Sequence, residues 1–320
     1  MILPMRVTII CIMMKNKTAA AYAGMVIYAV IVGFSFLVIK NSGASSSPVQ
    51  MMFFRFAAAF IPYIILLCTG VLKVSLKSMK RSSLLLTALT YVGFLGFQAF
   101  GMVYTTSIVS GILFAMVPVF ARIIGGILLK EKTSAVQNIF MAVSVCSVIA
   151  MFALGSADSL VGIDVRGFLL LLASSLCCAA SNVLMRYVKA DFAPLQIGFF
   201  SASTGLIVFT AAAVVANTVN GSWSTFFAPL SDGGYLLYIL YLGILCTIVT
   251  VNILSFSLKY LPAVNATIWG NLSTAISVVA GALILGEPLM PYQIVCAVLI
   301  IIGVLGISFS GANPARKRNI

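Results

Sequence analysis

The sequence predicts an all-α membrane protein of ten transmembrane helices, built as two inverted-topology repeats of five helices each. Three observations lead to this prediction. First, 62% of the 320 residues are hydrophobic and only 8% are charged, whereas soluble domains are about 45–50% apolar and about 25% charged. Second, the apolar residues form continuous runs long enough to cross a bilayer as helices. Third, the chain matches itself at a fixed offset, which indicates an internal repeat.

Each apolar run is predicted to form one spanning helix, because about 20 helical residues cross the hydrocarbon core. Turn-forming residues separate the runs, for example at residues 41–48, 155–158, 217–234 and 287–288. The linker 155–166 is expected to lie outside the cell, and residues 311–320 are expected to form a basic cytoplasmic tail. The predicted spans cover residues 19–39, 49–70, 82–103, 107–129, 135–154, 167–186, 194–216, 235–257, 263–285 and 291–310.

Basic residues favour one orientation of these spans. With both termini in the cytoplasm, 15 of the 19 Lys and Arg residues lie in cytoplasmic segments, and only Lys40 and Arg166 lie outside. Such an excess on the cytoplasmic side is the rule for bacterial inner-membrane proteins. The sequence therefore predicts a multi-pass protein of the cell inner membrane with cytoplasmic termini. The net charge of +13 is scattered over short loops, which argues against nucleic acid as a partner.

The segment before the first span, residues 1–18, is expected to be cytoplasmic. Its first 14 residues are apolar but too short to span, and the sequence MKNKT at 14–18 resembles a natural start. We therefore expect translation to begin at Met14. A cleavable signal peptide is the alternative, because Lys15 and Lys17 precede an apolar run. A retained first helix is preferred because it keeps the number of spans even.

The internal repeat relates residues 19–154 to residues 167–310. Each unit has five predicted helices, and an odd number forces the second copy to enter the membrane in the opposite sense. Transporters use such inverted repeats to exchange inward-open and outward-open states around a site near the bilayer midplane. The matches at an offset of 156 are Tyr104 with Tyr260, Gly125 with Gly281, Leu129 with Leu285, Glu131 with Glu287 and Gln137 with Gln293, and those at 146 are Pro48 with Pro194 and Gln50 with Gln196.

Several short motifs stand out in the two repeats: GFSFLVIK at residues 33–40, FRF at 54–56, Tyr104 with the small-residue span up to LKE at 129–131, and Tyr260 with the segment up to GEP at 286–288. Together they resemble the EamA-type branch of the drug/metabolite transporter superfamily. The resemblance extends over residues 19–310. It implies a ten-helix fold with cytoplasmic termini and a central cavity lined by the first, third, fourth, sixth, eighth and ninth helices. It also implies export of amino acids or related metabolites. Lys130 departs from the family, which has Gly before this Glu.

Arg122 is the first candidate for substrate binding, because an ionisable group inside a span is costly and marks a functional site by default. Gly111, Ala115, Pro118, Arg122 and Gly125 share one face of a continuous helix. The repeat places Thr267, Asn271, Thr274, Val278 and Gly281 on the matching face of the ninth span. We expect these faces to meet across a cavity, where Arg122 binds a carboxylate or phosphate while Asn271 and Thr274 orient the substrate. The alternative is that Arg122 extends to the cytoplasmic interface.

Other polar residues within the spans complete the predicted substrate site. They lie on helices that the family resemblance places around the cavity, and amides with an aromatic wall suit a ligand of amino-acid size. Single polar groups in spans also serve as contacts between helices. The set consists of Ser35, Gln98, Asn182, Asn252 and Trp269.

A second group of residues is expected to have structural or gating roles. Pro118 should loosen the backbone hydrogen bonds of the fourth span. Lys40 and Arg55 lie near the outer ends of their spans, where they anchor the interface or tie helices together. Glu131 and Glu287 are related by the repeat and should cap turns or pair with nearby donors at span ends.

The composition excludes several kinds of chemistry. Histidine is absent, which removes His-based metal sites, the common general base and the usual catalytic triad. The seven cysteines have no C-x-x-C spacing, and we expect neither disulfides nor a metal or cofactor. An intramembrane enzyme is the remaining alternative from another class, and it lacks a nucleophile with a base.

The predicted function is a carrier that exports a small polar metabolite, such as an amino acid, by alternating access. No Asp or Glu lies within the middle of a span, which disfavours an exporter of organic cations or drugs. That exporter and a sugar-phosphate or nucleotide-sugar exchanger remain the alternatives. The expected partners are the small-molecule substrate and the lipid bilayer, and the protein is expected to be a monomer or homodimer.

Overall fold

The computed structural model describes residues 17–70, 72, 81–128, 134–157, 164–188, 191–260 and 263–310; the side chains of 81, 156–157, 255, 258–259, 263–269, 271 and 308–310 are outside this description. The predicted segment 1–18 and tail 311–320 therefore lie almost entirely outside the described residues. The helices are α2 (Lys17–Ser45), α3 (Pro48–Cys68), α4 (Arg81–Gly101), α5 (Ser107–Phe114), α6 (Val117–Leu128), α7 (Ala135–Ala157), α8 (Val165–Val188), α9 (Pro194–Asn220), α10 (Gly233–Leu240), η3 (Tyr241–Val249), α11 (Thr250–Tyr260), α12 (Ala263–Ile284) and α13 (Pro291–Ser310), with the short 3-10 turns η1 (Trp223–Thr225) and η2 (Ala228–Ser231).

The two repeats begin their second helices in the same way. Pro48 and Pro194 each occupy the first turn, where the missing N–H of proline costs no helical hydrogen bond. Gln50 and Gln196 then accept hydrogen bonds from the backbone N–H of Ser47 and Ala193, at 3.4 and 2.9 Å. Local capping chemistry thus fixes both boundaries where the sequence predicts them.

Two predicted loops are partly helical. Helix α2 continues to Ser45, beyond the predicted end at residue 39, and serine hydroxyls stabilise this last part: Ser42 donates to the carbonyl of Ile39 and Ser46 to that of Ser42, both at 3.1 Å. Pro48 then prevents further continuation. Helix α9 likewise continues to Asn220 and ends at Gly221, whose φ of +62° is the left-handed conformation that glycine adopts readily.

The fourth predicted span is two helices rather than one. Helix α5 ends at Phe114, α6 begins at Val117, and the amides of Ala115 and Met116 donate three residues back, to Ile112 and Leu113. Pro118 is the cause, because it has no N–H to donate to Phe114 and its ring disfavours a regular helix before it. The break changes the helical phase, so residues before and after it need not share a face.

The eighth predicted span also departs from a regular α-helix. It begins as α10, widens to a π-helix in η3 and continues as α11. The widened turns are visible in the side-chain hydrogen bond from Thr247 to the carbonyl of Leu242, five residues back, at 3.0 Å. π-Helical turns are uncommon and concentrate at functional sites, and this one lies at the cavity described below.

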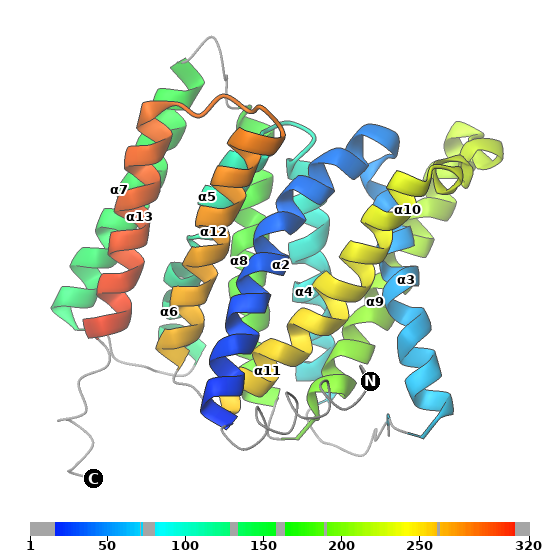
Figure 1. Ribbon diagram of the computed structural model, residues 1–320, viewed down its shortest axis with the longest axis horizontal. Coiled ribbons are helices and arrows are strands. Elements are labelled where there is room, and N and C mark those ends of the chain that lie inside the picture. Colours follow the sequence, from blue (N-terminus) through cyan, green and yellow to red (C-terminus); the bar gives the residue numbers. More distant parts are fainter. Residues whose placement is uncertain are drawn as a thin grey trace, which may run out of the picture.

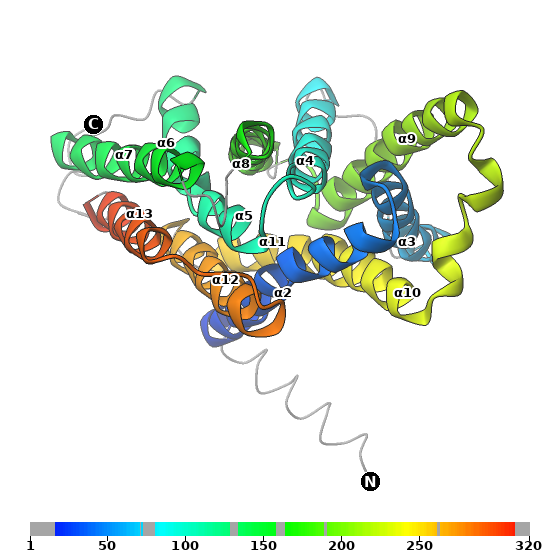
Figure 2. The same ribbon diagram turned by 90° about the horizontal axis from the view of Figure 1, so that it is seen from above.

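The helices form a bundle in which α2 begins and α13 ends at the same side (Figure 1). We call this side the Lys17 end, and the opposite side, where α2 ends, the Ser45 end. Seen along the bundle, α7 and α13 lie side by side at one edge and α3 and α9 at the other, with α4 next to α8 between them (Figure 2).

The contacts between helices are reciprocal with respect to the repeat. Helix α4 of the first half packs on α8 of the second, and α11 of the second half packs on α2 of the first. In the same way α6 packs on α8 and α12 on α2, while α7 packs on its own counterpart α13. This is the pattern expected of two like units related by a two-fold axis.

Eight of the described helices or helix pairs are long and apolar enough to cross a membrane, judged by length and composition. Two shorter apolar stretches, Leu272–Ile284 and Pro291–Ile307, accompany them. The all-α membrane class is therefore confirmed, and the count of ten crossings remains a prediction.

Candidate substrate cavity

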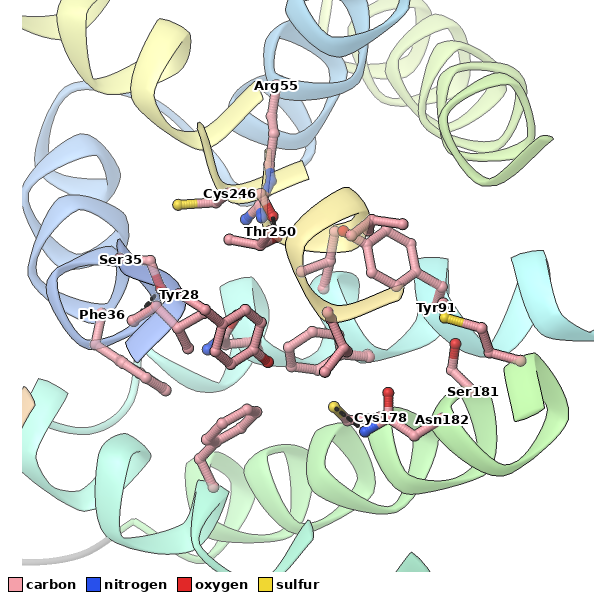
Figure 3. A pocket seen from close by; sticks show the side chains of 18 residues that line it. Tyr28, Ser35, Phe36, Arg55, Tyr91, Cys178, Ser181, Asn182, Cys246 and Thr250 are labelled. Carbon is pink, nitrogen blue, oxygen red and sulfur yellow. Dashed lines mark hydrogen bonds between the residues drawn. The ribbon is translucent and has the colours of Figure 1, made fainter. Parts of the chain in front are cut away.

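A narrow cavity lies between the two halves of the bundle (Figure 3). Its volume is about 60 Å³. A ligand larger than a few waters therefore fits only when the walls separate. The lining residues are Tyr28, Val32, Ser35, Phe36, Arg55, Tyr91, Phe94, Leu95, Gln98, Phe114, Cys178, Ser181, Asn182, Met185, Cys246, Thr250, Val251 and Leu254.

Arg55 is the one charged residue among the described residues that line the cavity. It lies in the third turn of α3, is 2% exposed, and its side chain extends to Cys246 and Thr250 of the neighbouring η3–α11 segment (Figure 3). Its Nε and Nη1 atoms are buried without a hydrogen-bond partner. Leaving a buried guanidinium without an anion costs several kcal/mol, so this site is suited to a negatively charged group.

Helix α3 approaches η3 closely at this point. Gly243 faces the carbonyl of Arg55, and a Cβ at Gly243 would stand 2.8 Å from that oxygen and 2.7 Å from Cβ of Ala58. η3 also ties to α2, because the hydroxyl of Tyr241 donates to the carbonyl of Ile31 at 2.8 Å. The π-helix η3 therefore packs against α3, which carries Arg55, and is hydrogen-bonded to α2.

A chain of aromatic rings forms much of the remaining wall. Tyr91 and Phe94 lie edge to face with ring centroids 6.1 Å apart, Phe94 stacks on Phe114 at 6.0 Å, and Phe114 meets Phe36 at 5.6 Å. Such contacts favour an apolar or aromatic group in the ligand. The wall therefore combines one cation with a largely apolar surface.

Three predicted binding residues, Ser35, Gln98 and Asn182, line this cavity together. The amide of Asn182 donates to the sulfur of Cys178 at 3.8 Å, and the hydroxyl of Ser35 donates to the carbonyl of Val32 at 2.7 Å. Arg55, predicted to be structural, joins them. Sequence reasoning missed Tyr28, Tyr91 and Thr250, because no spacing pattern separates a lining aromatic or hydroxyl residue from a packed one.

Arg122 is placed elsewhere. It does not line this cavity; its Nη2 donates to Oε1 of Gln137 on α7 at 3.2 Å. The prediction that Arg122 shares a face with Gly111 and Ala115 assumed that the fourth span is one continuous helix. The structure interrupts that helix before Pro118. Binding of substrate by Arg122 stays an untested prediction.

Thr274 and Asn252 do not line the cavity either. Thr274 is 1% exposed, and next to it α5 and α12 pack closely, since a Cβ at Gly111 would collide with the hydroxyl of Ser277. Asn252 donates to the carbonyl of Ile248 at 2.8 Å within its own helix and does not line the cavity. The side chains of Trp269 and Asn271 lie outside the described residues.

The turn between α4 and α5, residues 102–108, is held at the Ser45 end by groups from other elements. Nζ of Lys40 donates to the carbonyls of Met102 and Thr105, at 3.0 and 2.7 Å. The carboxylate of Glu287 accepts hydrogen bonds from the amide and hydroxyl of Ser107 at 2.8 and 2.7 Å, and from the amide of Ile108 at 3.0 Å. Glu287 therefore caps the first turn of a helix in the other half, which a carboxylate stabilises.

An arginine covers the same turn. The guanidinium of Arg166, at the start of α8, lies 4.6 Å from the ring centroid of Tyr104 and pairs with Asp164 at 2.8 Å. The hydrogen bonds from Arg166 keep the pKa of the half-buried Asp164 carboxyl below its usual value. At the Lys17 end, Lys17 lies 5.8 Å from the ring of Tyr260, the repeat counterpart of Tyr104. Glu131, the counterpart of Glu287, lies outside the described residues.

Comparison with known proteins decides the family. The EamA-like transporter family matches the chain twice, at residues 19–153 and 165–309. The chain belongs to the EamA-like transporter family. The predicted resemblance and the two-repeat organisation are thereby confirmed, and a membrane transporter is the general function of this EamA-like protein.

Two curated relatives, both from Bacillus subtilis (strain 168), carry the same general description. The EamA-like chain is 32% identical to the uncharacterized transporter YcxC over 306 residues, covering 95% of this chain and 97% of YcxC. It is 23% identical to the uncharacterized transporter YyaM over 297 residues, covering 87% and 92% of the two chains. A solved crystal structure with 16% identity and a TM-score of 0.56 covers 91% of this chain and 99% of its own, and shares the fold.

Proposed function

We propose that this EamA-like transporter exports a small polar metabolite of amino-acid size by alternating access to the cavity between its two halves. The observation that carries the proposal is the cavity itself, because residues from both repeats line it and its one charged group is buried. A site shared by two like halves is what alternating access requires.

The reciprocal contacts between the halves support an inverted repeat with ten crossings. Helices α4 and α8 pair as α11 and α2 do, and Arg166 on Tyr104 repeats the arrangement of Lys17 on Tyr260 at the other end of the bundle. The excess of basic residues supports a placement of the Lys17 end on the cytoplasmic side of the inner membrane.

In this conformation the cavity is proposed to be reached from the Lys17 end. Its lining includes both Met185, three residues from the end of α8 at the Lys17 end, and Gln98, three residues from the end of α4 at the Ser45 end, so the proposed side of access rests on the contacts that hold the Ser45 end. At the Ser45 end, Lys40, Arg166 and Glu287 hold residues 102–108 in place. The structural and gating roles predicted for Lys40 and Glu287 fit these contacts.

Counterflow in proteoliposomes tests the function. Vesicles are loaded with a neutral amino acid, and entry of its radiolabelled form is followed, with parallel series for a sugar phosphate and a quaternary amine. Amino-acid counterflow that protein-free vesicles lack is the expected result. Counterflow of the quaternary amine alone would favour the drug exporter, counterflow of the sugar phosphate alone the exchanger, and either would contradict the proposal.

A further inference from the structure

We propose that Arg55 is the residue that recognises the substrate, and that the substrate is a monocarboxylate with an apolar or aromatic remainder. The inference rests on the proposed carrier function and names the chemical class that its cavity accepts. It assigns to Arg55, rather than to Arg122, the binding of the substrate's negative charge.

The guanidinium of Arg55 is buried and incompletely hydrogen-bonded. The residue is only 2% exposed, and its Nε and Nη1 atoms have no hydrogen-bond partner. The four acidic residues that the structure describes, Asp164, Asp191, Asp232 and Glu287, all lie at helix ends or in the loops there. An arginine held in this way lacks the anion that buried cations require, and a carboxylate matches its donors with two parallel hydrogen bonds.

The single positive charge of the cavity lining favours a ligand with a single negative charge. Of the eighteen lining residues in the described part of the chain, Arg55 alone is charged. A carboxylate would neutralise it, whereas a phosphate dianion would leave a net negative charge in a site of low dielectric constant. A ligand whose only charge is positive would face Arg55 without a compensating carboxylate in the lining.

The rest of the lining describes the rest of the ligand. The rings of Phe36, Tyr91, Phe94 and Phe114 form a continuous surface that suits an apolar or aromatic group. Neutral oxygens are available from Gln98 and Asn182, which can accept hydrogen bonds from the ammonium group of an amino acid.

Three probes of one shape separate the charges: 3-phenylpropionate has only the carboxylate, phenethylamine only the ammonium group, and phenylalanine both. Thermal unfolding of the purified full chain with increasing ligand gives apparent affinities. We expect 3-phenylpropionate and phenylalanine to stabilise the wild-type protein and phenethylamine to have no effect. Equal stabilisation by 3-phenylpropionate and phenethylamine would overturn the assignment.

Variants locate the carboxylate. Arg55→Gln is expected to weaken binding of 3-phenylpropionate about thirtyfold or more, since truncating one partner of a buried charge pair typically costs at least that. Arg55→Lys should lie between, because it keeps the charge but loses the paired donors. Arg186→Gln, which removes an exposed cation at the end of α8 outside the cavity, is the matched control and should bind as the wild type does.

Other outcomes are equally decisive. If Arg122→Gln abolishes binding and Arg55→Gln does not, the assignment to Arg55 is wrong. If Arg55→Gln fails to fold, the comparison of Arg55→Lys with the wild type and the discrimination among the three probes still test it. Absence of any carboxylate effect together with intact counterflow would overturn the substrate class alone, whereas absence of counterflow would contradict the carrier function itself.

Discussion

At the scale of single residues, the position of Arg55 depends on a glycine in another helix. Gly243 lets η3 approach α3 so closely that only hydrogen fits between Gly243 and the carbonyl of Arg55. Close approach of backbones through small residues is the usual way in which helices associate in membranes. The geometry of the cation thus depends on a residue that does not itself line the cavity.

Gly243→Ala tests this dependence. The added Cβ would stand 2.7 Å from Cβ of Ala58 and 2.8 Å from the Arg55 carbonyl, and overpacking of this kind costs about 1–3 kcal/mol. We expect a lower unfolding temperature in detergent and weaker binding of 3-phenylpropionate. Gly43→Ala in α2 is the control, because a Cβ there meets nothing within 4 Å; equal behaviour of the two variants would contradict the account.

At the scale of elements, Glu287 links the two halves at the Ser45 end by capping α5. Its carboxylate accepts three hydrogen bonds from Ser107 and Ile108. A cap of this kind is worth about 0.5–2 kcal/mol, which is large enough to change the ratio of two conformations severalfold. The contact is therefore suited to hold that end closed.

Glu287→Gln should favour opening at the Ser45 end, because the neutral amide has one acceptor oxygen in place of two. Cys178, which lines the cavity, serves as reporter in a variant without the other cysteines. We expect a membrane-impermeant thiol reagent added outside the cell to label it severalfold faster than in the parent. Asp232→Asn, which alters the cap of Gly234 on α10, is the matched control; no change in labelling for Glu287→Gln would refute the gating role.

The elements also show how far sequence reasoning extends. Hydropathy and turn chemistry located the helices, and the starts at Pro48 and Pro194 were predicted because capping is local. The break in the fourth span lies next to Pro118, where proline itself disfavours a regular helix, whereas no sequence pattern indicates the widened turns of η3. Arg55 lines the cavity and Arg122 does not; the shared face proposed for Arg122 assumed a continuous helix, which the structure interrupts, and its role in binding stays a prediction.

At the scale of the whole molecule, the two halves contact one another through the same helices on both sides of the cavity. α4 with α8 and α11 with α2 form its walls, whereas α7 and α13 pair at the edge of the bundle. Walls that are equivalent by the repeat can exchange conformations at little cost in free energy. A narrow cavity that must widen to accept a ligand is consistent with such an exchange.

Side-specific labelling of Cys178 tests the central claim, that the two halves enclose a carboxylate-binding cavity reached from the Lys17 end. Inverted and right-side-out vesicles holding the Cys178-only protein are treated with an impermeant thiol reagent, with and without 3-phenylpropionate. Cys68, exposed at the end of α3 outside the cavity, is the control in a second variant. The account predicts faster labelling of Cys178 from the cytoplasmic side and protection by 3-phenylpropionate, with Cys68 unaffected; labelling only from the outside, or no protection, would contradict it.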